Sequence, residues 1–166
     1  MKKTLFSLIL TVLMLLSLTL ATYASETESS VTSTDESTTI YNDDGTYTVI
    51  SAPEANPTTQ TTRAATHDVS GKVSATNYSN KTGKVNWVYT LIGYFTYEEG
   101  VSCVSTNSTY EIAINTSGWK FYDASNTWSD NAAYGYGVFK CKFAFITTNT
   151  TIIDLRIQCD NYGNFY

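Results

Sequence analysis

Alternating apolar and polar positions dominate residues 84–97, which read K-V-N-W-V-Y-T-L-I-G-Y-F-T-Y. The odd positions are apolar or aromatic except for one glycine, and the even positions mix apolar with polar side chains. A period of two with β-branched and aromatic enrichment predicts a strand with one buried face and one partly covered face. Because this stretch is longer than a usual strand, Gly93 is the expected kink or bulge.

The same alternation continues through residues 66–166. A second long strand is expected at 134–147, with Phe139 and Cys141 on its apolar face. The other expected strands are 69–75, 101–106, 109–115, 119–123 and 152–159, with turns at 77–83 and 148–151 and a loop at 125–132. Short strands separated by Gly, Asn, Ser and Thr turns predict an all-β fold. We expect an antiparallel β-sandwich, Ig-like, of about seven strands.

The first 24 residues have the pattern of a secretory signal peptide. Two lysines precede an apolar run at 5–20, and Thr22 and Ala24 fit the small-residue positions of a cleavage site. The run is shorter than the roughly 20 residues that a spanning helix needs. We therefore expect cleavage after Ala24 and a secreted, extracellular protein. The alternative is an uncleaved signal peptide that anchors the chain, which is the only membrane contact expected of a binding module.

Residues 25–65 are polar and acidic, which predicts a largely disordered leader or linker before a domain at 66–166. The leader holds seven acidic residues and one basic residue, and too few apolar side chains to bury a core. One island, 40–50, carries the hairpin-type turn Asp44-Gly45 between apolar residues. An isolated hairpin is marginal in water, so this one either docks on the domain or fluctuates.

Charge and metal-binding residues exclude several functional classes. In residues 66–166, eight acidic and seven basic residues nearly cancel, so no basic footprint for nucleic acid is present. The single histidine, His67, and the absence of a C-x-x-C sequence remove most zinc-ligand combinations. We expect no metal and no cofactor. Three cysteines in an exported chain instead indicate a structural disulfide.

Two cysteine pairings are compatible with the predicted strands. Cys141 faces Cys159 if the hairpin of the last two strands pairs residues whose numbers sum to 300, and a one-residue shift breaks that opposition. A bond between Cys103 and Cys159 would instead join a middle strand to the last strand. It would close a longer loop, which stabilises slightly more in the chain-entropy model. The strand pattern alone leaves this choice open.

Four short motifs are spread over the second half of the chain. They are G-Y-F-T-Y at 93–97, V-S-C-V-S at 101–105, S-G-W-K-F at 117–121 and D-L-R-I-Q-C at 154–159. This combination resembles a group of small exported bacterial proteins of uncharacterised function, in which a signal peptide and polar leader precede a compact β domain. The resemblance implies a disulfide between Cys103 and Cys159 and a free, core-facing thiol at Cys141. It implies no activity.

Patterns typical of catalysis are weak. His67 lies where the leader meets the domain, a poor position for activating a nucleophile. Glycoside hydrolysis needs two carboxylates about 5–9 Å apart in a cleft. The candidate carboxylates are Glu98, Glu111, Asp123, Asp130 and Asp154. Nothing in their spacing brings two of them together, so we expect no catalytic residues, with a small glycan-active enzyme as the alternative.

Aromatic side chains are abundant, with 3 Trp, 13 Tyr and 7 Phe. Most occupy inward positions and build the core. Those that do not fit cleanly inside are Tyr94, Tyr122, Trp128, Tyr134 and Tyr136, of which Tyr94, Trp128, Tyr134 and Tyr136 are the predicted ligand-binding residues. Exposed aromatics beside Asn, Asp and Ser are typical of a sugar-binding platform. The prediction requires that they cluster on one exposed face.

The expected function is a secreted, non-catalytic β-sandwich module with a binding or structural role at the cell surface or in the medium. Its expected partner is a glycan or a surface protein. A secreted toxin or antimicrobial is a further alternative, because the hairpin at 134–159 is long enough to line a membrane pore. Its cysteines and dense aromatics are more typical of a fixed core.

Overall fold

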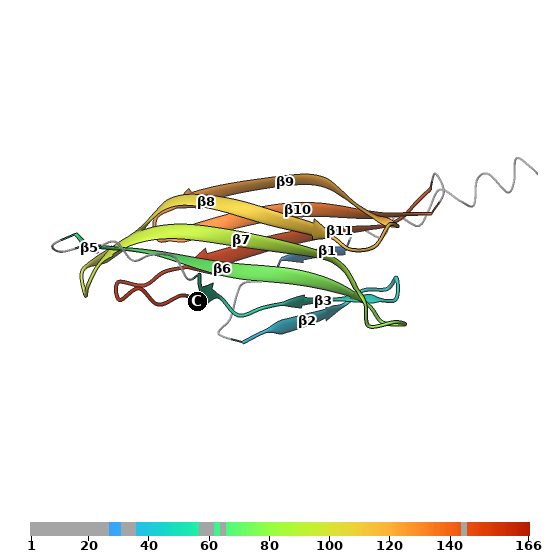
Figure 1. The fold of residues 1–166 in the computed structure, drawn as a ribbon, viewed down its shortest axis with the longest axis horizontal. Coiled ribbons are helices and arrows are strands. Elements are labelled where there is room, and N and C mark those ends of the chain that lie inside the picture. The colour runs from blue at the N-terminus through green and yellow to red at the C-terminus, as the bar shows by residue number, and fades with distance from the viewer. Residues whose placement is uncertain (1–26, 31–35, 57–61, 64–65, 144–145) are drawn as a thin grey trace, which may run out of the picture.

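The computed structural model describes residues 27–30, 36–56, 62–63, 66–143 and 146–166. The strands in these residues are β1 (Thr27–Ser30), β2 (Thr38–Tyr41), β3 (Thr46–Ile50), β4 (Glu54–Ala55), β5 (Thr62–Arg63), β6 (Thr66–Ser79), β7 (Val85–Glu98), β8 (Ser102–Ile114), β9 (Trp119–Ser129), β10 (Ala132–Phe143) and β11 (Ile146–Gln158). Sheet A has the strand order β1-β11-β10-β9, and sheet B has the order β2-β3-β6-β7-β8. β4 and β5 also pair with β6 (Figure 1). The described part of the chain contains no helix.

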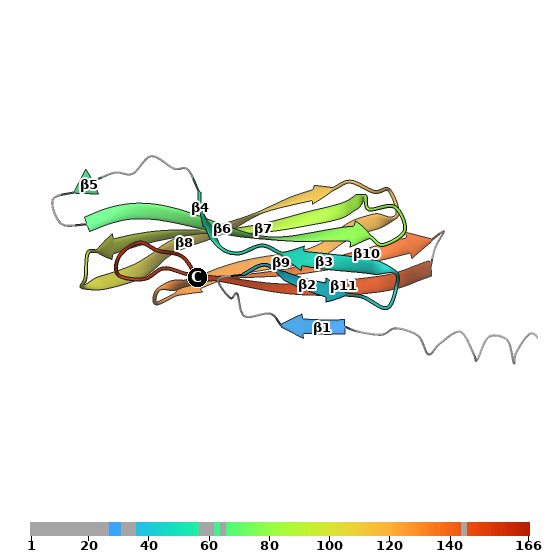
Figure 2. The ribbon, with the colours of Figure 1, turned by 90° about the horizontal axis from the view of Figure 1, so that it is seen from below.

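The two sheets form a sandwich. β6 contacts β11, β7 contacts β10, and β8 contacts β9 across the interior. The long strands run along the long axis of the molecule, as Figures 1 and 2 show. They pair in antiparallel fashion, and the pairing of β1 with β11 is parallel. The predicted all-β sandwich is therefore confirmed, whereas its Ig-like character stays a prediction.

Strand β7 is the central wall of the core, as its alternating pattern predicts. Trp87, Tyr89 and Leu91 are fully buried. The ring of Trp87 stacks on Phe139 of the opposite sheet, with 4.0 Å between ring centroids. Gly93 lies beside a register shift between β7 and β8, rather than at the shift itself. A Cβ at this position would come within 2.6 Å of the Phe95 ring, so Gly93 is needed for close packing.

Three predicted irregular segments are continuous strand instead. β11 runs through the predicted turn at 148–151, and β9 through most of the predicted loop at 125–132. The predicted strands at 101–106 and 109–115 merge into β8, where a register shift absorbs the irregularity. These segments are rich in Thr, Ser and Asn, which suit both turns and solvent-facing strand positions. Their polarity reflects exposed positions on the strands.

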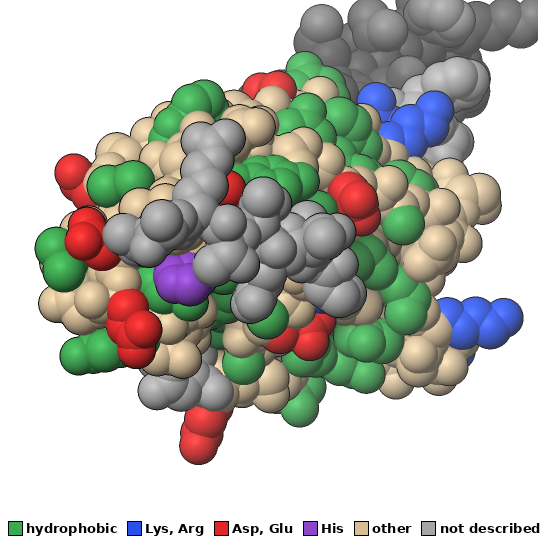
Figure 3. Space-filling view, turned by 60° about the vertical axis from the view of Figure 1, so that its left-hand side comes forward, with side chains coloured by type: hydrophobic (Ala, Val, Ile, Leu, Met, Phe, Trp, Pro, Cys, Tyr) green, Lys and Arg blue, Asp and Glu red, His purple; other side chains and the backbone are tan. Residues whose placement is uncertain are grey.

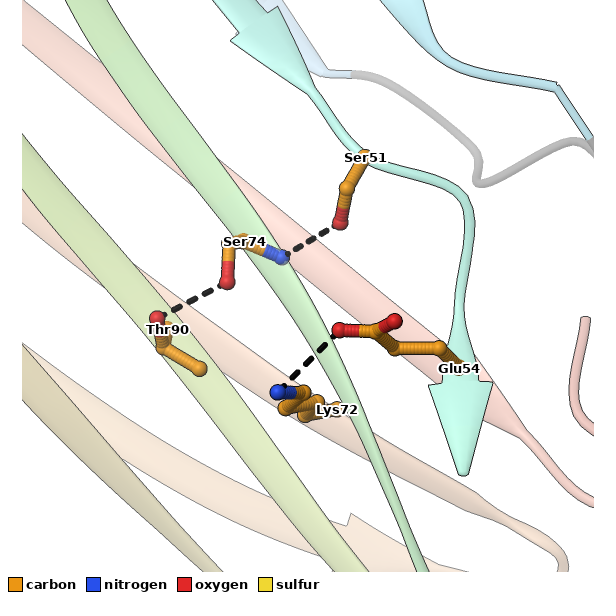
Figure 4. A network of polar contacts seen from close by, with 5 residues as sticks. All are labelled: Ser51, Glu54, Lys72, Ser74 and Thr90. Atoms are coloured by element: carbon orange, nitrogen blue, oxygen red, sulfur yellow. Dashed lines mark hydrogen bonds and ion pairs between the residues drawn. The ribbon is translucent and has the colours of Figure 1, made fainter. Parts of the chain in front are cut away.

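The hairpin predicted at 40–50 docks on the sandwich. β2 pairs with β3, and β3 pairs with β6 over 46–50. Farther along, β4 also pairs with β6, and an ion pair of 3.1 Å joins Glu54 to Lys72 (Figure 4). The Ser51 hydroxyl accepts a hydrogen bond from the Ser74 backbone N–H in the same region. Residues 38–55 therefore belong to the sandwich, which begins earlier in the chain than position 66.

Buried polar side chains hold the docked hairpin in register. The Asn77 side-chain amide donates to the hydroxyls of Thr46 and Thr48, at 3.2 and 3.1 Å. Its carbonyl oxygen accepts a 2.8 Å hydrogen bond from Asn86. Asn77 and Thr48 are almost completely buried. Because an unpaired buried amide is costly, this network opposes a slipped register of the hairpin.

The segment after β11 folds back over one end of the core. Phe165 forms a β-bridge with Cys159, and its ring lies 5.7 Å from that of Phe95. The Asp160 carboxylate closes this loop by accepting hydrogen bonds from the backbone N–H groups of Tyr162 and Asn164, at 2.8 and 2.9 Å. The Asn164 side chain donates a third, at 2.9 Å.

We expect this loop to open in acid. Burial alone would raise the pKa of Asp160, but the hydrogen bonds from Asn164 and Tyr162 outweigh it and lower the pKa below its ordinary value. A carboxyl whose folded pKa is lowered stabilises the fold above its unfolded pKa of about 3.9, and this contribution is lost as pH falls through the folded pKa. Amide hydrogen exchange of Tyr162 and Asn164 should therefore accelerate below about pH 4.

The variant Asp160→Asn separates this effect from general acid unfolding. It lacks the titrating group, so exchange of the two amides should already be faster at pH 7 and show no further step in acid. An acid step of unchanged size in the variant would assign the transition to another carboxyl.

Candidate functional site

The outer face of β10 brings two of the four predicted ligand-binding aromatics together. Ala133 and Phe139 point into the core and are fully buried. Because neighbouring side chains on a strand point to opposite faces, the even positions of β10 face outward. These positions are Tyr134, Tyr136, Val138, Lys140 and Lys142. β10 is flanked by β9 and β11, so this surface is supported on both sides.

The other two predicted aromatics lie elsewhere. Tyr94 alternates with the buried Phe95 on β7, so it faces outward from sheet B, on the opposite side of the sandwich. Trp128 pairs with Ala133 on the inward side of edge strand β9 and is 45% exposed. The four residues therefore do not form one cluster, and only the pair Tyr134 and Tyr136 continues to indicate a binding face.

Three further residues complete that face. Arg156 pairs with Tyr134 across β10 and β11, with its guanidinium carbon 5.7 Å from the ring centroid. Tyr122 is 64% exposed, and the Lys140 ammonium lies 3.5 Å from its ring centroid. We call the set Tyr122, Tyr134, Tyr136, Lys140 and Arg156 the tyrosine face.

Tyr122 reaches this face from a bulge in β9. Val138 pairs with Asp123, but the next residue, Phe139, pairs with Phe121, which leaves Tyr122 as the extra residue of β9. Such a bulge turns a side chain away from simple alternation. The face also holds an unsatisfied hydrogen-bond donor: Arg156 Nε is buried without a hydrogen bond within the described structure.

The candidate carboxylates are distributed over the molecule. Glu111 pairs with Thr90 on the outer side of sheet B, whereas Glu98 and Asp130 lie at strand ends. Asp123 and Asp154 share the outer side of sheet A, but β10 separates them, which places their backbones about 10 Å apart. They stand on an open sheet surface. His67 stacks on Tyr97, with 5.0 Å between ring centroids.

The register of β10 and β11 rules out the Cys141–Cys159 alternative. Paired residues have numbers that sum to 290 over most of this hairpin, so Cys141 faces Asn149. Roughly ten residues, about 33 Å of strand, separate Asn149 from Cys159. Cys103 and Cys159, in contrast, lie together at the end of the sandwich, close enough for each thiol to shift the pKa of the other.

The two adjacent thiols differ in reactivity. Cys159 is fully buried, whereas Cys103 is partly exposed. The interaction with Cys159 lowers the pKa of Cys103, while the same interaction and burial raise the pKa of Cys159. Cys103 is therefore the thiol that more readily becomes a nucleophilic thiolate. Cys141 packs partly buried against the core, away from this pair.

The family-model scan, the search of curated proteins and the search of solved structures each found no match to this chain. Among the described residues, His, Cys, Asp and Glu side chains do not gather in threes as a metal site would require. The described residues also include no helix with the length and hydropathy of a membrane span.

Proposed function

We propose that this protein is an exported, non-catalytic module that binds carbohydrate through the tyrosine face of sheet A. The observation that carries the proposal is the placement of Tyr134 and Tyr136 at alternate positions of one interior strand, with Arg156 beside them. Aromatic rings stack on the apolar face of a pyranose, while neighbouring polar groups bond its hydroxyls. Interior strands hold such rings in fixed positions, which lowers the ordering cost of binding.

The non-catalytic part of the proposal is supported by the carboxylate positions. A glycosidase needs an acid and a second carboxylate on either side of one scissile bond. Asp123 and Asp154, the two that share a face, have a whole strand between them. Both stand on the outer surface of a sheet, so the proposal is that this face holds a sugar without cleaving it.

Export and a structural disulfide are the remaining parts of the proposal. The signal-peptide pattern ending at Ala24 supports export, and the thiol contact supports a bond between Cys103 and Cys159. In oxidation, the Cys103 thiolate attacks the disulfide of an exported thiol–disulfide oxidoreductase and forms a mixed disulfide. Cys159 then attacks the Cys103 sulfur. Two protons and two electrons leave the thiols, and the oxidoreductase departs as a dithiol.

Glycan-array binding by the mature chain, residues 25–166, tests the carbohydrate proposal. We expect Tyr136→Ala to weaken binding about tenfold or more, because a ring in the centre of a binding face is a typical hot spot. Tyr94→Ala is the matched control, since it removes the same ring from the outer side of sheet B. Equal losses in both variants, or no glycan bound by the unmodified chain, would overturn the proposal.

A further inference from the structure

Positive charge is concentrated at one end of the outer side of sheet A. Lys120 on β9 lies directly opposite Lys140 on β10. Lys142 follows two positions later on the same side of β10. Lys120 and Lys142 are exposed, and the ion pair found within the described residues, between Lys72 and Glu54, is on sheet B. We call Lys120, Lys140 and Lys142 the lysine cluster.

This arrangement is unfavourable for the fold alone. Like charges directly opposite each other on neighbouring strands are destabilising. The cation–π contact with Tyr122 offsets part of this cost for Lys140. The immediate neighbours, Gly118 and Thr150, are uncharged. The acidic residues on this side of sheet A, Asp123 and Asp154, lie farther along the strands, beside Val138 and Tyr136. Local conflicts without structural compensation are characteristic of functional sites.

The cluster also stands apart within the overall charge distribution. The full chain has a net charge of −5. Figure 3 views the opposite end of the sandwich, where acidic side chains gather, and its Lys and Arg side chains all lie toward the right of that view. Glu98, Glu99 and Asp130 occupy the turns at the acidic end. Asp44, in the turn between β2 and β3, lies at the lysine end and bonds to Asn149, so the positive charge is confined to the outer side of sheet A. An anion is therefore attracted to this side of that end.

We propose that the ligand of the tyrosine face is an anionic polysaccharide whose acidic groups bind the lysine cluster while its sugar rings stack on the tyrosines. This inference rests on the proposed function and names its substrate class. Along β10, Tyr134 and Lys142 are separated by about 27 Å, so a ligand that reaches both must be an extended chain. Tyr122 lies between the two ends, and its ring packs against the Lys140 ammonium and so holds that charge on the path of the ligand.

Matched charged and neutral polymers test this inference. Binding of the mature chain to polygalacturonate is compared with binding to its fully methyl-esterified form, and binding to dextran sulfate with binding to dextran. We expect each anionic polymer to bind about tenfold more tightly than its neutral partner at low ionic strength, and the difference to shrink as salt screens exposed charges. Equal binding of charged and neutral partners would overturn the inference.

The double variant Lys120→Gln/Lys140→Gln locates the charge effect. It should bind the anionic polymers about tenfold more weakly. The matched control Lys81→Gln/Lys84→Gln removes two charges from the connection between β6 and β7 and should change binding less than about twofold. Thermal stability should change little, because loss of the contact between Lys140 and Tyr122 offsets removal of the like-charge pair. An unchanged midpoint of thermal unfolding excludes a folding defect. Equal losses in both double variants would overturn the lysine cluster as the site.

The outcomes separate this inference from the proposed function. If neutral polymers bind as well as anionic ones and Tyr136→Ala abolishes both, the tyrosine face binds sugar and the inference of an anionic ligand fails. If no polymer binds, both fail. Lysine-dependent binding to phosphatidylglycerol vesicles without polymer binding would assign the cluster to a membrane surface, and would also overturn the inference.

Discussion

Reduction of the disulfide proposed between Cys103 and Cys159 is expected to lower the free energy of unfolding by about 4 kcal/mol. The bond would close a loop of roughly 57 residues, and the chain-entropy model assigns about this amount to a loop of that length. It would also join sheet B to sheet A, because Cys103 lies on β8 and Cys159 directly follows β11. Urea unfolding with and without reductant measures the difference.

Cysteine variants show whether the effect belongs to this bond. Cys103→Ser/Cys159→Ser should lose the response to reductant, whereas Cys141→Ser should keep it. Thiol labelling of the unfolded, oxidised protein should modify one cysteine, Cys141. Three labelled thiols in protein recovered from an oxidising compartment would refute the bond.

The single variants should behave differently because the two sulfurs are unequally exposed. Cys159→Ser leaves Cys103 as a partly exposed thiol with no partner, so mixed disulfides and disulfide-linked dimers should accumulate. Cys103→Ser leaves a fully buried thiol, which should stay reduced. Equal dimer formation by both variants would contradict the assignment of Cys103 as the attacking thiol.

Truncation of Trp87 is expected to lower the free energy of unfolding by about 3–5 kcal/mol. Its indole is fully buried, stacked on Phe139 at 4.0 Å and edge-on to Trp119 at 6.1 Å between ring centroids. Trp87→Ala leaves a large cavity between the sheets and removes both ring contacts. The midpoint of urea unfolding measures the loss.

Two matched substitutions define the origin of this effect. Trp128→Ala removes the same side chain from a site that is 45% exposed, and should cost less than about 1 kcal/mol. Trp87→Phe keeps a ring against Phe139 and also removes the indole N–H, which is buried without a hydrogen bond in the described structure. It should therefore cost much less than Trp87→Ala. Similar losses for Trp87→Ala and Trp128→Ala would contradict this account of the core.

The period-two pattern predicts the fold class because it reports which side of each strand is buried. It identifies Trp87, Tyr89 and Phe139 as core residues, and all three are buried. It fails at 148–151 and 125–132, where Thr, Ser and Asn side chains occupy exposed positions on strands. Turn-forming and solvent-facing polar residues have the same composition, so only the cross-strand pairing distinguishes them.

The candidate site depends on register, which a single strand does not reveal. Lys120 faces Lys140 because a bulge at Tyr122 shifts β9 by one residue against β10. The proximity of Cys103 to Cys159 likewise depends on how the two sheets stack, since their strands belong to different sheets. Strand alternation predicts that Tyr134 and Tyr136 share a face, and the structure places both on the outer side of β10.

The docked hairpin has a consequence for solubility. β6 is fourteen residues long, and β3, β4 and β5 cover successive parts of the edge that faces away from β7. A chain cut at residue 66 would leave this edge as a row of unpaired backbone N–H and C=O groups. Such an edge is a template for pairing with other copies of the chain and hence for aggregation. We therefore expect the strands of the polar leader to protect the sandwich from aggregation, even though the composition of the leader is that of a spacer.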